Sequence, residues 1–62
     1  MIFKFDIFRV ETTGVLWLEA VASLDEAETR VKQLSKGNPT EFLILDQRTG
    51  DRHLIKFDGV NA

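Results

Sequence analysis

The chain has 62 residues and a net charge of −2, with one histidine and no cysteine. A chain of this length forms one domain, residues 1–62, which buries only about 60% of its unfolded surface. No disulfide can form, and one histidine without cysteine does not suit a structural zinc site. We therefore expect no metal and no cofactor, and we expect self-association to supply part of the missing stability.

The pattern of charge and of apolar residues argues against three classes of protein. Eight basic and ten acidic residues are mixed along the chain, whereas nucleic-acid binders carry a basic stripe. The apolar runs are too short to cross a bilayer. The first residues, MIFKFDIF, lack the basic and continuous apolar segments of a secretion signal. These patterns predict a cytoplasmic protein that contacts neither nucleic acid nor membrane.

Two strands are predicted before the helix. Apolar and polar residues alternate at the start of Ile2–Val10, which is typical of a strand with one buried face. After the turn TTG, Val15–Val21 returns as a second strand. Strict alternation places Leu16, Leu18 and Ala20 of this strand on one face and Val15, Trp17 and Glu19 on the other.

The helix signal follows directly. Ser23 and Glu26 match a capping box at a helix start. Gly37 can take the left-handed position after the helix, and Pro39 prevents its continuation. An apolar stripe is expected from Leu24, Ala27, Val31 and Leu34. Ion pairs along the helix are expected between Glu26 and Arg30 and between Glu28 and Lys32.

Two more strands, Glu41–Asp46 and Arg52–Asp58, are joined by the turn QRTG, and the tail Gly59–Ala62 should fray. The order strand, strand, helix, strand, strand predicts a two-layer α+β fold, ββαββ, with one helix on one face of a four-stranded sheet.

Element order and length resemble the β-grasp of immunoglobulin-binding bacterial surface domains and ubiquitin-like proteins. That resemblance implies strand order 2-1-4-3, with the first and last strands parallel at the centre. The run FLIL, residues 42–45, is apolar on both faces and favours an antiparallel alternative, order 2-1-3-4.

Four motifs occur between Val15 and Gly50: a strand ending in W-x-E-A, a capped helix, P-x-E-[FY] and a D-x-x-T-G hairpin. In these motifs the chain resembles a group of short, uncharacterised bacterial hypothetical proteins. The motifs are structural, so the resemblance implies no catalytic residue.

The segment DQRTGDRH gathers the side chains that could carry chemistry. An enzyme would use His53 with Asp46 or Asp51 as an acid–base pair, and Arg48 and Arg52 to hold an anion. A hairpin would place Gly50 at positive φ among polar turn residues. We favour the hairpin and expect no enzyme, because one helix on a small sheet leaves little room for a pocket of about 300 Å³.

The strands hold more large apolar side chains than one helix can cover. We expect Phe3, Phe5, Ile7, Leu16, Leu18, Phe42, Ile44, Ile55 and Phe57 to face the helix. The opposite face then holds Phe8, Val15, Trp17, Leu43, Leu45 and Leu54, with Lys4, Asp6, Glu19 and Lys56 among them.

An apolar patch of this size usually marks an interface. We therefore predict a non-catalytic binding or assembly module that forms a homodimer through this face. The first alternative is a regulatory partner of a larger protein that uses the same face. A less favoured alternative is a small enzyme that uses His53.

Overall fold

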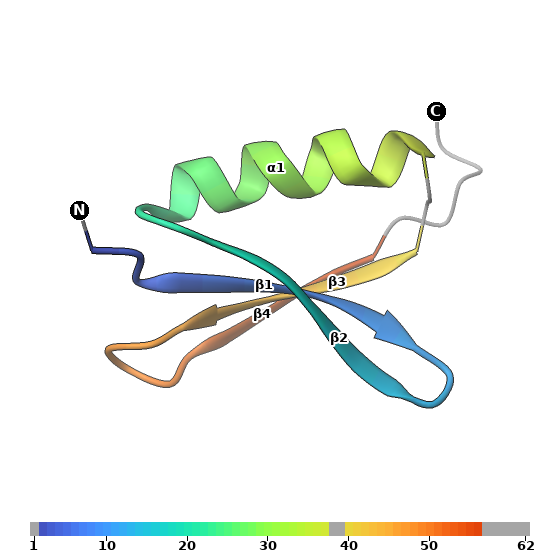
Figure 1. Cartoon of the computed structure of the whole chain (residues 1–62), viewed down its shortest axis with the longest axis horizontal. Helices are drawn as coiled ribbons and strands as arrows, with labels where there is room; N and C mark the ends of the chain where they lie inside the picture. Colours follow the sequence, from blue (N-terminus) through green and yellow to red (C-terminus); the bar gives the residue numbers. More distant parts are fainter. Residues whose placement is uncertain (1, 38–39, 57–62) are drawn as a thin grey trace.

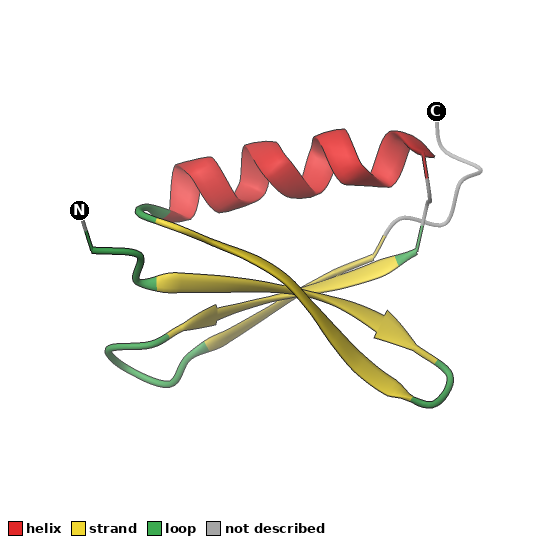
Figure 2. Cartoon of the chain, in the orientation of Figure 1, coloured by secondary structure: helices red, strands yellow, loops and turns green. Residues whose placement is uncertain are grey.

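The computed structural model describes residues 2–37 and 40–56. Over these residues the chain forms four strands and one helix in the order ββαββ. The elements are β1 (Phe5–Glu11), β2 (Gly14–Val21), α1 (Leu24–Gly37), β3 (Glu41–Asp46) and β4 (Arg52–Lys56). The helix lies along one face of the sheet (Figure 1, Figure 2), so the predicted two-layer α+β fold is confirmed.

The four strands pair antiparallel in the order β2-β1-β3-β4. This is the alternative order predicted from FLIL, and the β-grasp order 2-1-4-3 with parallel central strands is wrong. The side chains of β3 give the reason. Phe42 and Ile44 are buried on the helix side, and Leu43 and Leu45 are half-buried on the other face. A strand that covers apolar groups on both faces is suited to a central position.

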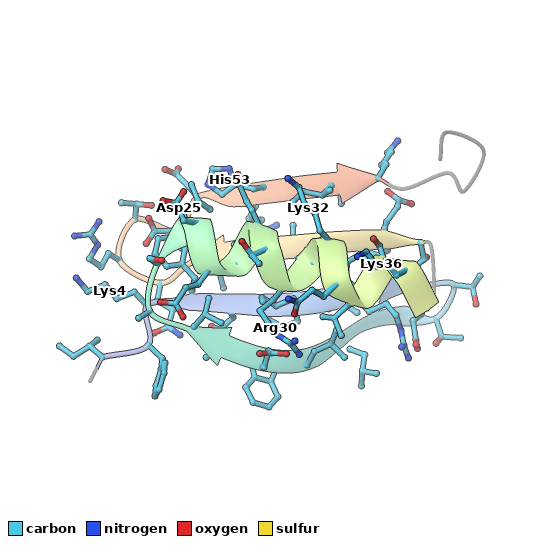
Figure 3. All side chains as sticks on the ribbon, turned by 90° about the horizontal axis from the view of Figure 1, so that it is seen from above. Lys4, Asp25, Arg30, Lys32, Lys36 and His53 are labelled. Carbon is cyan, nitrogen blue, oxygen red and sulfur yellow. The ribbon has the colours of Figure 1, made fainter. Side chains whose placement is uncertain are left out.

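The hydrophobic core lies between α1 and the sheet. The helix stripe is confirmed, because Ala27 and Val31 are fully buried while Leu24 and Leu34 pack at the margin of the core. The sheet contributes Phe5, Ile7, Val21, Phe42 and Ile44, with Leu18 and Ile55 packed against them. In Figure 3, α1 lies over the middle of the sheet and β4 runs along the edge beyond it.

Some residues expected in this core lie outside it. The first strand begins at Phe5, so Phe3 precedes it and is 51% exposed. Leu16 is on the helix side but 44% exposed, because it lies near the end of an edge strand. The predictions for Pro39, Phe57, Asp58 and the tail 59–62 fall outside the described residues.

The ends of the helix agree in part with the sequence. The Ser23 hydroxyl accepts a hydrogen bond from the Glu26 backbone N–H at 3.2 Å, so the Ser23 half of the predicted capping box is present. Gly37 is the last residue of the helix, and among the described residues the positive φ angles belong to Gly14 and Gly50. The expected left-handed position of Gly37 is therefore wrong.

A β-bulge in β2 overturns the predicted alternation of that strand. Consecutive residues of β1, Ile7 and Phe8, pair with Glu19 and Trp17, so Leu18 is an extra residue on β2. Because side chains alternate with a period of two, the extra residue moves Glu19 to the helix side. The expectation that Glu19 lies among the residues of the opposite face is wrong for this reason.

The displaced Glu19 forms an ion pair with α1. Its carboxylate accepts hydrogen bonds from Nη2 of Arg30 at 2.7 Å and from Nε at 3.1 Å. Arg30 also donates to Gln33, so among the described residues its ion pair is with β2 and the predicted pair with Glu26 is wrong. The hydrogen bonds to Glu19, and then its charge, raise the pKa of Arg30. This pair links the bulge to the helix.

Candidate functional site: the open face of the sheet

The sheet has one face turned away from α1, which we call the open face. Directly paired residues of an antiparallel sheet share a face, so the register gives the layout of this surface. Its central row crosses the whole sheet, with Trp17 on β2, Phe8 on β1, Leu43 on β3 and Leu54 on β4. One apolar side chain from every strand therefore contributes to a continuous line.

A further row lies on each side of this line. Toward the turn between β1 and β2 the open face carries Val15, Val10, Glu41 and Lys56. Toward the turn between β3 and β4 it carries Ala20, Asp6, Leu45 and Arg52. The structure thus brings together all six residues singled out from the sequence: Phe8, Val15, Trp17, Leu43, Leu45 and Leu54. The position of Ala20 on this face was missed, since it depends on the bulge.

Exposure on the open face is greatest at the two edge strands. Trp17 and Leu54 are each 54% exposed and Val15 is 56% exposed, while Phe8 and Leu43 on the central strands are half-buried. The helix side shields its apolar residues far better, because Ile7, Phe42 and Ile44 are at most 1% exposed. The open face is therefore the larger apolar surface that the single chain leaves in water.

One carboxylate, that of Asp6, lies within this apolar surface. Its Oδ1 accepts a hydrogen bond from Nε1 of Trp17 at 3.1 Å, and its Oδ2 accepts one from Nε2 of Gln47 at 2.9 Å. Both donors are neutral. A carboxylate can accept about four hydrogen bonds, so acceptor sites remain. The ion pairs among the described residues join Arg9 to Glu11 and Arg30 to Glu19, and neither involves Asp6.

The segment DQRTGDRH forms the predicted hairpin turn. The buried Asp46 accepts the Arg48 backbone N–H on its carboxylate at 2.9 Å and the Gly50 N–H on its carbonyl oxygen at 2.8 Å. The Thr49 hydroxyl accepts the Asp51 N–H at 3.1 Å. Gly50 has a φ of +80°, as predicted. The D-x-x-T-G motif thus supplies the hydrogen bonds and the backbone conformation of the turn.

The candidate catalytic residues are divided between the two faces of the sheet, with Asp46 and His53 on the helix side and Arg52 on the open face. His53 is exposed on β4, pairs with Ile44 on the helix side, and lies beyond the helix in Figure 3. Arg52 pairs with Leu45 and belongs to the open face. An open hollow of about 270 Å³ lies on α1 instead, lined by Asp25, Glu26, Thr29 and Arg30. The hollow and His53 are therefore on different elements.

Within residues 2–37 and 40–56, no group of three or more His, Cys, Asp or Glu side chains is placed to hold a metal ion. The part of the chain that the structure describes contains no helix long and apolar enough to cross a membrane.

Comparison with models of known protein families, with curated proteins and with solved structures finds no match to this chain. The resemblance to short bacterial proteins therefore stays a prediction.

Proposed function

We propose that the chain is a small, non-catalytic binding or assembly module that forms a homodimer through the open face. The observation that carries this proposal is the apolar row across all four strands, with Trp17 and Leu54 both more than half exposed. Aromatic and aliphatic residues at the centre with charges at the margin are typical of an interface. A chain of 62 residues also gains much from extra buried area.

The size of the face agrees with a modest interface. The chain measures 35 × 24 × 16 Å between Cα atoms, and Figure 1 looks along the shortest of these axes with the sheet seen edge-on. The open face therefore spans at most about 35 × 16 Å, and two stacked copies would cover at most roughly 1,100 Å² in total. Specific interfaces bury at least about 1,000 Å², so we expect a dimer that dissociates on dilution.

The charges favour a second copy as the occupant. The outer rows of the open face carry Asp6 and Glu41 but also Arg52 and Lys56. A face with two acidic and two basic groups can be complementary to itself, whereas a face of one sign would need a partner of the opposite sign. The alternative, a regulatory partner of a larger protein, uses the same residues and predicts a chain that is monomeric by itself.

The test is solution mass by light scattering across a dilution series, with Trp17 fluorescence measured alongside. We expect dimers at high concentration and a red shift of the emission as they dissociate. Leu54→Ser should shift the equilibrium toward monomer. Leu16→Ser is the matched control, because Leu16 is also on an edge strand and 44% exposed, but on the helix side.

Two results would contradict the proposal. A dimer that survives Leu54→Ser but is lost in Leu16→Ser would put the interface on the helix side. A monomer at every concentration would exclude the homodimer and leave the regulatory partner as the candidate, with a partner still to be captured on the open face.

A further inference from the structure

We infer that the two-fold axis of the dimer runs along the strands, so that Arg52 of each copy forms an ion pair with Asp6 of the other. The inference rests on the proposed function. It adds the orientation of the second copy and names the pair of residues that determines this orientation.

Symmetry leaves two main ways to stack the open face on itself. A closed dimer of identical faces has its two-fold axis in the plane between them. Sheets that pack face to face usually keep their strands within about 30° of each other. The axis therefore runs either along the strands or across them. Along the strands, β2 of one copy covers β4 of the other, and β1 covers β3. Across the strands, each strand covers its own equivalent.

The charges distinguish the two arrangements. An axis across the strands exchanges the two outer rows, so Lys56 of each copy would face Arg52 of the other. This contact of like charges would occur twice, and like charges across an interface are strongly unfavourable. An axis along the strands keeps each row opposite the same row. Lys56 then faces Val15, and Arg52 faces Ala20.

The central row also fits the axis along the strands. Trp17 of one copy then lies opposite Leu54 of the other, and Phe8 lies opposite Leu43. Both contacts pair a ring with an aliphatic side chain. The other axis would set Trp17 against Trp17 and Leu54 against Leu54.

The preferred arrangement brings a cation to Asp6. Arg52 of the second copy faces Ala20, whose methyl group leaves room for a long side chain to pass. Asp6 pairs with Ala20 on the neighbouring strand, about 4.8 Å away. Within one copy, Leu45 on β3 lies between Asp6 on β1 and Arg52 on β4, and β1 and β4 are roughly 10 Å apart.

The half-buried Asp6 needs such a partner once the face is covered. Burying a carboxylate that has only neutral donors is unfavourable, and a guanidinium that reaches its free acceptor sites offsets that cost. Trp17 and Gln47 already hold the carboxylate in place, so it is fixed before the second copy binds. The ion pair therefore favours one orientation over the other.

A charge exchange tests the pair. Arg52→Asp sets two carboxylates against each other and should raise the dimer dissociation constant at least about tenfold. The double variant Asp6→Arg/Arg52→Asp restores opposite charges and should recover most of the loss. Lys32→Glu, an equal charge change on α1, is the control and should leave dimerisation unchanged. A double variant no better than Arg52→Asp, although folded by circular dichroism, would overturn the pairing.

Cysteine cross-linking tests the axis without altering Asp6. The chain has no cysteine of its own, so single cysteines give clean products. An equal mixture of Val15→Cys and Lys56→Cys should cross-link on oxidation, and each variant alone should not. The other axis predicts cross-links between Val15→Cys and Ala20→Cys. If light scattering shows a dimer but the cross-link forms between Val15→Cys and Ala20→Cys, the orientation is overturned and the proposed function stands. A monomer in light scattering would overturn both.

Discussion

Replacing Trp17 with alanine should weaken the dimer strongly, and the structure gives the magnitude. A tryptophan side chain has up to about 250 Å² of surface, and 54% of this residue is exposed in the single chain. About 130 Å² per copy is therefore available for burial, which corresponds to about 3 kcal/mol at about 25 cal/mol per Å². Alanine retains a small part of this area. The dimer contains two such side chains, so we expect a loss of about 5 kcal/mol per dimer, or a rise in Kd of roughly 4,000-fold.

The assay must separate association from folding. The rest of the Trp17 side chain is buried, and its indole N–H donates to Asp6, so Trp17→Ala should also lower the free energy of unfolding. Circular dichroism identifies the folded fraction. Because the chain has one tryptophan and no tyrosine, the variant has almost no absorbance at 280 nm, and light scattering with refractive-index detection should give its mass.

Trp17→Phe is the companion variant. It keeps an aromatic ring in the central row and removes the hydrogen bond to Asp6 together with part of the ring area, so it should retain most of the dimer. If Trp17→Ala is folded and dimerises with the constant of the original chain, the open face is not the interface and the area argument is wrong.

Three further predictions concern the fold. Ile44 is fully buried, so Ile44→Val should lower the free energy of unfolding, measured in urea, by about 1 kcal/mol. Ile44→Ala should lower it by about 2–5 kcal/mol, and circular dichroism should then show that so small a domain is unfolded. Asp46→Ala removes the acceptor for the Arg48 N–H and should cost about 1–3 kcal/mol in the same assay. Glu19→Gln should make stability less sensitive to added salt. Because the pKa of Arg30 is raised in the folded state, its ion pair stabilises the fold fully below the pKa of Arg30 in the unfolded chain. This stability is lost only as the pH rises through the pKa of Arg30 in the folded chain. The melting difference between Glu19→Gln and the original chain should therefore be constant from about pH 7 to 10. A melting difference that shrinks within this pH range would contradict the stabilising role given to the ion pair of Arg30 and Glu19.

Local patterns in the sequence predicted most of the fold. The helix stripe, the Ser23 cap and the positive φ of Gly50 depend on residues within a few positions of each other, and all three are present. Strand order depends on contacts between distant segments. The two-sided apolar character of β3 favoured the correct order, whereas the overall order of elements pointed to the wrong one.

The composition of the open face could be predicted in part. All six predicted apolar residues lie where strict alternation with the correct register places them, because Val15 and Trp17 both precede the bulge in β2. The error concerns Glu19, because nothing in the sequence of β2 alone marks Leu18 as an extra residue. The ion pair of Arg30 was missed for the same reason. Strict alternation places Glu19 on the open face, away from α1 and from Arg30.

The bulge also connects the fold to the proposed interface. In a regular strand that keeps Trp17 on the open face, Glu19 would follow on that face beside Asp6, and two carboxylates would share one apolar surface. The extra residue moves Glu19 to Arg30 and places the small Ala20 beside Asp6. One irregularity thus removes an anion from the open face and leaves space next to Asp6. The W-x-E-A motif therefore has a physical meaning here. Its tryptophan lies on the open face, its glutamate binds Arg30 on the helix side, and its alanine leaves space beside Asp6.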